Sequence, residues 1–180
     1  MLTLRKSYSI LFILILLIST QLMAQENTFS KFEECGLSPQ ARELAYLIIE
    51  STDQQRSKLM CNKKLAKIAL IKAKLMASTN KISHRINYIT PNQLLRQHDI
   101  TLPNNYPMFD NQVESIMGAV KTAQQSYDIF MTSPDHKSHL LGEKDFLLKQ
   151  NQIGIGFYKD KNSDFVYHWV VYITQIIFKE

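Results

Sequence analysis

The chain reads Met131-Thr-Ser-Pro-Asp-His-Lys-Ser-His-Leu-Leu-Gly142, then Gln152-Ile-Gly-Ile-Gly-Phe-Tyr158, and then Phe165-Val-Tyr-His-Trp-Val-Val-Tyr-Ile-Thr174. Ser133 is a good helix cap, and Pro134 suits the first helical position. Gly142 can end this short helix in a left-handed conformation. The two later segments are apolar on both faces, which indicates strands that are covered on both sides. Residues 159–164 are polar and predict a hairpin loop. We therefore expect helices on both sides of a small sheet.

The composition is that of an ordinary globular protein. The chain has 180 residues, of which 45% are hydrophobic and 21% charged, and this is enough for one domain with a real core. The net charge is +5, and the basic residues are spread over helix faces and loops. No stripe of Arg and Lys interleaves with aromatic residues, so nucleic-acid binding has little support.

Residues 1–24 have the pattern of a signal peptide. Arg5 and Lys6 form a positive region, Ile10 to Ile18 is an uninterrupted apolar run, and Ala24 precedes a plausible cleavage point. The apolar run is shorter than the ~20 residues that a membrane-spanning helix needs, which favours a cleaved signal over an anchor. We predict a secreted or periplasmic protein that is not an integral membrane protein after cleavage.

Two cysteines, Cys35 and Cys61, follow this leader. In an oxidising compartment an even pair predicts a disulfide, and two buried free thiols are the alternative. The bridge would close a loop of about 25 residues and contribute roughly 3 kcal/mol. Metal binding through this pair alone has no support, because His and Cys partners at zinc-finger spacing are missing.

Further helices are predicted upstream. Ser38-Pro39 begins one of them. Residues 54–79 carry the longest helical pattern, with an apolar face and lysines around it that we interpret as a solvated face.

Several motifs occur in the order found in a known family. Ser133-Pro134-x-His136, Leu140-Leu141-Gly142, Ile153-Gly154-Ile155-Gly156 and Trp169 resemble bacterial members of the CAP superfamily, also called SCP-like. The resemblance implies an α+β fold, a three-layer α-β-α sandwich with a small antiparallel sheet between helices. We divide the chain into a signal peptide (1–24), an N-terminal helical extension (25–60) and a CAP/SCP-like domain (61–180).

The resemblance also implies a site. Val113-Glu114-Ser115-Ile116 is similar to the family's Gly-Glu-Asn-Ile element, and His84 matches the site histidine that follows the first long helix. His84, Glu114 and His136 are thus the candidate metal ligands and catalytic residues, for Zn²⁺ or another divalent cation. Metal-bound water could be a nucleophile, with Glu114 as a base. The alternatives are a hydrogen-bonded polar cluster, or a loop histidine and a strand-edge carboxylate that face water.

Other polar residues are weaker candidates. Many eukaryotic relatives have a second glutamate where this chain offers Asp128 as a substitute. His139 shares a helical face with His136, and we interpret it as a surface residue rather than a partner of the site. We interpret His168 as a core histidine and His98 as a helix cap or surface residue. Serines and histidines are available for a catalytic triad, but nothing in the sequence positions one.

Three functions remain open. The first is an exported binding or interaction module whose cleft holds a divalent metal or a small lipid-like or cell-surface ligand. The second is a metal-dependent hydrolase that acts on peptide or cell-wall material. The third is a structural envelope protein. The missing second glutamate favours binding over catalysis.

Overall fold

A four-stranded sheet lies at the centre of the structure, a computed structural model that describes residues 29–177. The strand order is β1-β3-β4-β2, and the strands are β1 (Met60–Cys61), β2 (Glu114–Gly118), β3 (Gln152–Lys159) and β4 (Tyr167–Thr174). Strands β3, β4 and β2 are antiparallel neighbours, as expected. The two-residue strand β1, which the sequence did not predict, pairs parallel to β3 and makes the sheet mixed.

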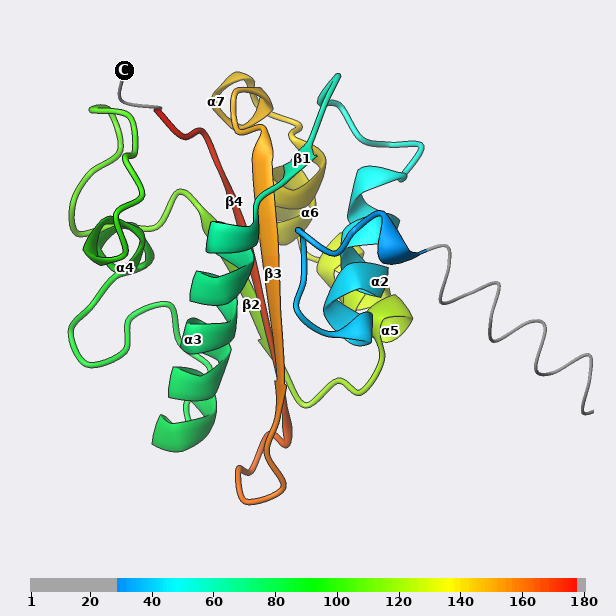
Figure 1. The fold of residues 1–180 in the computed structure, drawn as a ribbon, viewed down its shortest axis with the longest axis vertical. Helices are drawn as coiled ribbons and strands as arrows, with labels where there is room; N and C mark the ends of the chain where they lie inside the picture. Colours follow the sequence, from blue (N-terminus) through cyan, green and yellow to red (C-terminus); the bar gives the residue numbers. More distant parts are fainter. Residues whose placement is uncertain (1–28, 178–180) are drawn as a thin grey trace, which may run out of the picture. The chain divides into compact units, whose positions relative to one another are not determined.

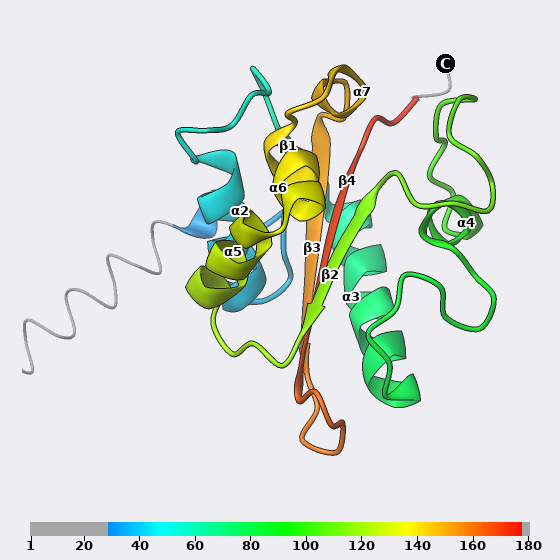
Figure 2. The same ribbon diagram turned by 180° about the vertical axis from the view of Figure 1, so that it is seen from behind.

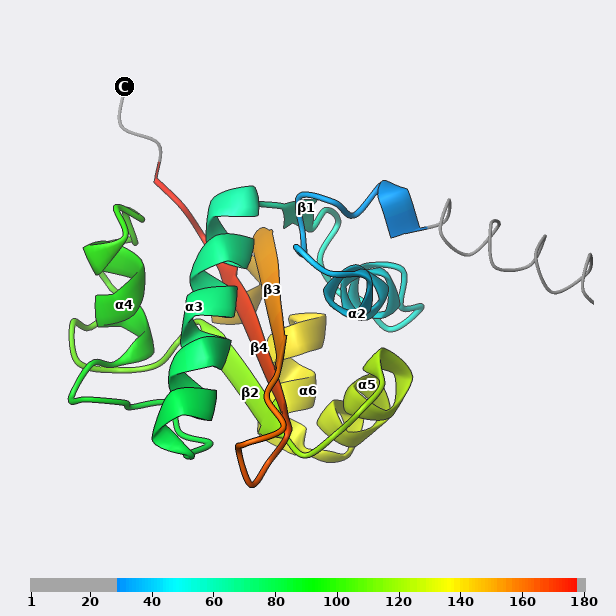
Figure 3. The ribbon, with the colours of Figure 1, turned by 60° about the horizontal axis from the view of Figure 1, so that its bottom comes forward.

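Helices cover both faces of this sheet (Figures 1 and 3). On one face lie α2 (Pro39–Ile49), α5 (Ala123–Thr132) and α6 (Pro134–Leu141). On the other face lies α3 (Lys63–Thr79), with α4 (Pro91–Gln97) beside it. The short helix α7 (Asp145–Leu148) precedes β3. The predicted α+β fold with helices on both sides of the sheet is confirmed.

The two outer layers pack against alternating side chains of the same strands. In β4, Trp169 and Val171 belong to the core that includes α2, whereas Val170 and Tyr172 belong to the core that includes α3. Leu44 of α2 shares a cluster with Trp169, so residues before 61 contribute to the main core. The boundary at residue 61 stays a prediction about where the family resemblance begins.

Most of the predicted helix ends are confirmed. Ser38 caps α2, and its side chain accepts a hydrogen bond from Ala41 N at 3.2 Å. Ser133 is the N-cap of α6 and Pro134 its first residue. Gly142 ends α6 with a φ of +75°, which explains why a glycine is needed there.

The predicted start of the long helix at residue 54 is wrong. Helix α3 begins at Lys63, where the Asn62 side chain accepts a hydrogen bond from Leu65 N at 3.1 Å. The preceding Cys61 lies in β1 and forms the predicted disulfide with Cys35. Pairing with β3 holds residues 60–61 in an extended strand, and the helix can start only after them.

Helix α3 packs very closely against β3. A Cβ atom added to Gly154 would lie 2.2 Å from Ala66 N, and one added to Gly156 would lie 2.2 Å from Ala69 C. These strand glycines leave the room for a close neighbour that the sequence predicted. Within residues 29–177, no helix is both long enough and apolar enough to cross a membrane, and the predicted signal peptide lies outside this range.

Candidate functional site

A cleft of about 410 Å³ lies at the β2 edge of the sheet. Seen from behind, β2 is the outermost strand, with α6 to one side and the chain that enters from α4 to the other (Figure 2). The residues that line the cleft include all three predicted site residues and further polar side chains: His84, Glu114, Ser115, Asp135, His136 and His139. Residues far apart in the sequence therefore meet in one cavity.

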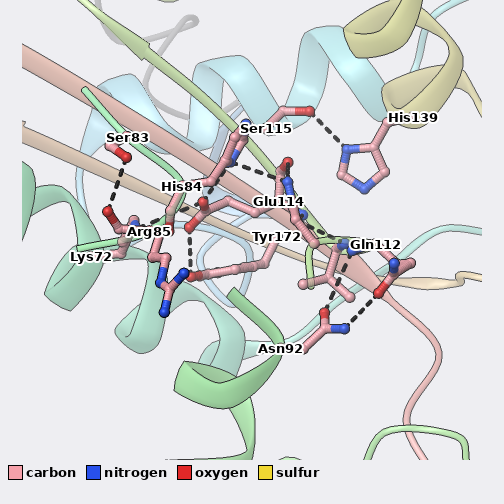
Figure 4. Close-up of polar contacts among 12 residues, drawn as sticks. Lys72, Ser83, His84, Arg85, Asn92, Gln112, Glu114, Ser115, His139 and Tyr172 are labelled. Carbon is pink, nitrogen blue, oxygen red and sulfur yellow. Dashed lines mark hydrogen bonds and ion pairs between the residues drawn. The ribbon is translucent and has the colours of Figure 1, made fainter. Parts of the chain in front are cut away.

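Glu114 is the centre of a buried hydrogen-bond network (Figure 4). Its side chain is fully buried, and Oε2 accepts a hydrogen bond from the Tyr172 hydroxyl at 2.7 Å. Its Oε1 lies 2.8 Å from His84 Nδ1 and 3.8 Å from Lys72 Nζ. Burial, followed by the charge of Glu114, raises the pKa of Tyr172 well above its ordinary value. Both carboxylate oxygens therefore already have protein partners, and Glu114 does not face water.

The interpretation of the α3 lysines as a solvated face is wrong for Lys72. Its side chain is only 2% exposed, and Nζ donates a hydrogen bond to the His84 carbonyl oxygen at 2.5 Å. Burial lowers the pKa of Lys72, and the charge of Glu114 opposes this effect. The spacing Leu65, Ala69, Lys72 and Met76 follows the buried face of a helix and could have revealed this lysine.

The imidazole of His84 is held in one orientation. Because an ionised carboxylate only accepts hydrogen bonds, we assign the proton to Nδ1, which donates to Glu114. Within the described part of the chain, His84 Nε2 makes no hydrogen bond. The side chain is 42% exposed, so the Nε2 lone pair is available to a ligand in the cleft.

Asn111, which is not among the predicted site residues, fixes the backbone beneath this pair. Its side-chain amide accepts a hydrogen bond from Glu114 N at 2.9 Å and donates one to Glu114 O at 3.0 Å. The amide thus pairs with the strand edge as a neighbouring strand would. A lone asparagine in a polar loop carries no sequence signal for this role.

His136 lies in the first turn of α6, as predicted, and its ring packs edge-on against Phe130 at 5.1 Å. Burial lowers its pKa, the nearby His84 lowers it further, and Asp135 opposes the effect. A lowered pKa keeps the imidazole neutral, which is the form that accepts hydrogen bonds or binds metal.

The interpretation of His139 as a surface residue is wrong. His139 is only 8% exposed, and its Nδ1 lies 2.8 Å from Ser115 Oγ (Figure 4). Its Nε2 lies 3.4 Å from the Ile173 carbonyl oxygen. Burial, and then the charge of Arg56, lower its pKa to about 3. The reason is that α6 packs against β2, where the His139 ring meets Ser115 of that strand.

The remaining candidates lie outside the cleft. His168 is fully buried, and its Nε2 lies 3.1 Å from Ser163 Oγ, in agreement with a core histidine. His98 is the C-cap of α4, as expected. Asp128 accepts a hydrogen bond from Gln124 at 2.8 Å and does not line the cleft.

A divalent metal fits this cleft only in part. Among residues 29–177, no group of three His, Cys, Asp or Glu side chains gathers closely enough to hold a metal ion. Glu114 is engaged by other protein groups, which leaves the imidazoles of His84 and His136 as nitrogen donors. A zinc site ordinarily has at least three protein ligands.

Comparisons with known proteins place the fold. No family model and no curated protein sequence matches this chain. Its structure is similar to an outer surface protein from Borrelia burgdorferi, with 20% identity over 75% of this chain and 88% of that protein, at a TM-score of 0.52. It is also similar to an extracellular protein containing a SCP domain from Bacillus anthracis str. Ames, with 16% identity and a TM-score of 0.52. That match covers 76% of this chain but only 39% of the Bacillus protein. The chain therefore has an SCP-like fold.

Proposed function

We propose that this chain is an exported binding module of SCP-like fold whose cleft takes a small, mainly polar ligand between His84 and His136. One observation carries the proposal: the buried Glu114 orients the His84 ring and leaves its Nε2 free at a cleft that His136 also lines. A ligand that meets pre-oriented groups loses less free energy to the ordering of side chains.

The character of the lining favours a polar ligand over a lipid-like one. Of the ten residues that line the cleft, Leu147 is the only aliphatic one, and the others carry amide, hydroxyl, carboxylate or imidazole groups. A lipid chain would leave these groups without partners, which costs free energy. A small polar part of a cell-surface molecule suits the cleft better.

A divalent cation such as Zn²⁺ is the second ligand that we propose. His84 Nε2 and a nitrogen of His136 would hold it, and Glu114 would serve as the carboxylate that orients the His84 ring. The bound metal would act as a Lewis acid toward a ligand oxygen. With two protein donors, the other positions are left to water or to the ligand.

Export is supported by three observations. The predicted signal peptide and the Cys35–Cys61 disulfide both suit an oxidising compartment outside the cytoplasm. The two similar structures are named as an outer surface protein and an extracellular protein. We propose a periplasmic or extracellular location for this chain.

Calorimetric titration of the mature chain with zinc chloride tests the metal proposal. We expect one-to-one binding that is lost in His84→Ala and in His136→Ala. The matched control is His98→Ala, which removes a histidine at the end of α4 and should bind zinc like the parent. Absence of binding to the parent chain, or equal binding by all variants, would refute the metal site.

The binding proposal is tested separately and without metal. In the presence of EDTA, imidazole NMR signals of His84 and His136 are followed while short peptides and N-acetylated sugars are added. We expect at least one of these probes to shift both signals and to leave His98 unchanged. A panel that moves neither signal contradicts the binding module and favours a structural envelope protein.

The metal-dependent hydrolase has less support in the geometry. It requires Glu114 to activate a water molecule, yet this carboxylate is fully buried and bonded to Tyr172 and His84. A carboxylate whose two oxygens already accept hydrogen bonds in a buried position is a poorer base toward a water molecule in the cleft than an unengaged one.

A further inference from the structure

We propose that Ser115 and His139 form a nucleophile–base pair that hydrolyses a small carboxylic ester in this cleft. This activity goes beyond the proposed binding function and needs neither a metal nor Glu114. It makes the same cavity a slow, metal-independent esterase.

The hydrogen bonds around His139 place its lone pair on the correct nitrogen. The Ile173 carbonyl oxygen can only accept, so the ring proton belongs on Nε2, which lies 3.4 Å away. Nδ1 is then the acceptor, and the Ser115 hydroxyl donates to it at 2.8 Å. Ser115, its base His139 and the carbonyl group that orients the base therefore form a chain of hydrogen bonds, as nucleophilic catalysis requires.

The position of the pair allows a substrate to approach. Ser115 and His139 are buried, with 1% and 8% of their surfaces exposed, but both line the 410 Å³ cleft. Ser115 comes from the edge strand β2 and His139 from α6, so two elements of the fold hold the pair together. A cleft of this size has room for a small-molecule ester.

We place the donors for the developing negative charge at the start of α6. Pro134 has no amide N–H, and Ser133 makes no capping hydrogen bond with its side chain, so the N–H groups of Asp135 and His136 lack that partner. Asp135 and His136 of this first turn line the same cleft. Backbone N–H groups in such a position can stabilise the oxyanion of an acyl-transfer reaction.

The environment of His139 keeps the imidazole neutral and also limits its strength as a base. Burial and the charge of Arg56 lower the pKa of His139 to about 3, so Nδ1 is unprotonated at neutral pH. A base with so low a pKa takes a proton less readily than one near pH 7. We therefore expect acylation of Ser115 to be slow.

The reaction balances with water as the co-reactant. Ser115 Oγ bonds to the ester carbonyl carbon while its proton moves to His139 Nδ1. The carbon–oxygen bond to the alcohol then breaks, and Nδ1 returns the proton to the departing oxygen. Water attacks the acyl group on Ser115, its proton passes through Nδ1 to Ser115 Oγ, and a carboxylic acid leaves.

The residue type at position 115 separates this chain from the family that it resembles. The similar Gly-Glu-Asn-Ile element has an asparagine where this chain has Ser115. An amide side chain is not a nucleophile of this kind, whereas a hydroxyl beside a histidine is.

Covalent labelling of the mature chain with a fluorophosphonate in EDTA tests the proposal. Peptide mass spectrometry of the parent chain should find one phosphonyl group, on Ser115. Ser115→Ala should abolish the labelling. His139→Asn, which keeps a hydrogen-bond acceptor but cannot take the proton, should slow labelling by about 100-fold or more.

Ser78→Ala is the matched control, because Ser78 is an exposed serine of α3 that bonds only to the Leu75 carbonyl. It should label like the parent chain. Circular dichroism of each variant checks that it is folded, and the labelling site of the parent does not depend on any variant. No adduct on Ser115 in the folded parent, or an adduct whose rate is unchanged in a folded His139→Asn, would overturn the proposal.

Discussion

Glu114 illustrates how one residue organises the site. Its buried carboxylate is balanced by the Lys72 ammonium and by hydrogen bonds from Tyr172 and His84. A buried ion pair contributes little net stability, because both charges lose their hydration. Removal of one partner is costly, since the other charge then remains buried and uncompensated. The same arrangement that orients His84 is therefore a sensitive point for folding.

We predict that Glu114→Gln lowers the free energy of unfolding by about 3–5 kcal/mol, because it leaves the Lys72 ammonium buried without a counter-charge. Urea denaturation measures this loss. Glu143→Gln is the control, since Glu143 pairs with Lys137 at 3.7 Å on the surface and should change stability by less than about 1 kcal/mol. Equal effects of the two variants would show that the Glu114 network does not stabilise the fold.

The lowered pKa of His139 predicts that the stability of the fold depends on pH. Its pKa is about 3 in the folded chain and about 6.5 when unfolded, so between these values only the unfolded chain binds the proton. The free energy of unfolding should therefore fall by roughly 1.4 kcal/mol per pH unit as the pH drops from about 6 toward 3. Urea denaturation at several pH values should show a shallower slope in His139→Asn than in the parent, and parallel slopes would contradict the prediction.

At the scale of elements, the contact between α3 and β3 depends on two glycines. Gly154 and Gly156 lie on one face of β3 and allow the α3 backbone to approach the strand. Lys72 lies on this same helix, so a displacement of α3 would also move the ammonium that supports Glu114 and the His84 carbonyl. The packing of one helix against one strand thus connects the core with the cleft.

Gly156→Ala should destabilise the chain by at least about 3 kcal/mol or prevent folding, because the new Cβ would lie 2.2 Å from the Ala69 backbone. Thermal denaturation measures the loss. Gly118→Ala is the comparison, since its nearest neighbours are atoms of the Ile82 side chain, which can move. A smaller loss in Gly156→Ala than in Gly118→Ala would mean that α3 can shift without cost.

At the scale of the whole molecule, the cleft is a product of chain topology. His84, Glu114 and His136 come from a loop, the edge strand β2 and the start of α6. The Cys35–Cys61 disulfide joins the segment before α2 to strand β1, and Cys35 O also accepts a hydrogen bond from Ile155 N at 2.7 Å. The segment around Cys35 is thereby tied to the central sheet.

The double variant Cys35→Ala/Cys61→Ala should lose about 3 kcal/mol of stability, because the bridge spans 26 positions and restricts the unfolded chain. For a chain of this size the melting temperature should fall by roughly 6–12 °C. Differential scanning calorimetry measures the change, and dithiothreitol should lower the melting temperature of the parent but not of the variant. An unchanged melting temperature would show that the bridge is not stabilising.

Local signals were sufficient for much of the fold. Ser133 and Pro134 start a helix through their effect on the local backbone. The apolar residues of β3 and β4 indicate buried strands through the hydrophobic effect. Both signals lie within a few neighbouring positions. The predicted disulfide required only the cysteine count and an exported chain. The start of α3 was misplaced because residues 60–61 pair with β3, a long-range contact that the local pattern does not contain.

The site depended on contacts that no short stretch of sequence contains. The family resemblance pointed to His84, Glu114 and His136, but the burial of Lys72 and the pairing of His139 with Ser115 appear only after folding. Ser115 and His139 are 24 positions apart and meet because β2 forms the edge of the sheet on which α6 packs. The sequence alone was therefore enough to predict the helices that begin at Pro39 and Pro134 and the strands β3 and β4, whereas strand order and helix packing established which polar groups are buried together.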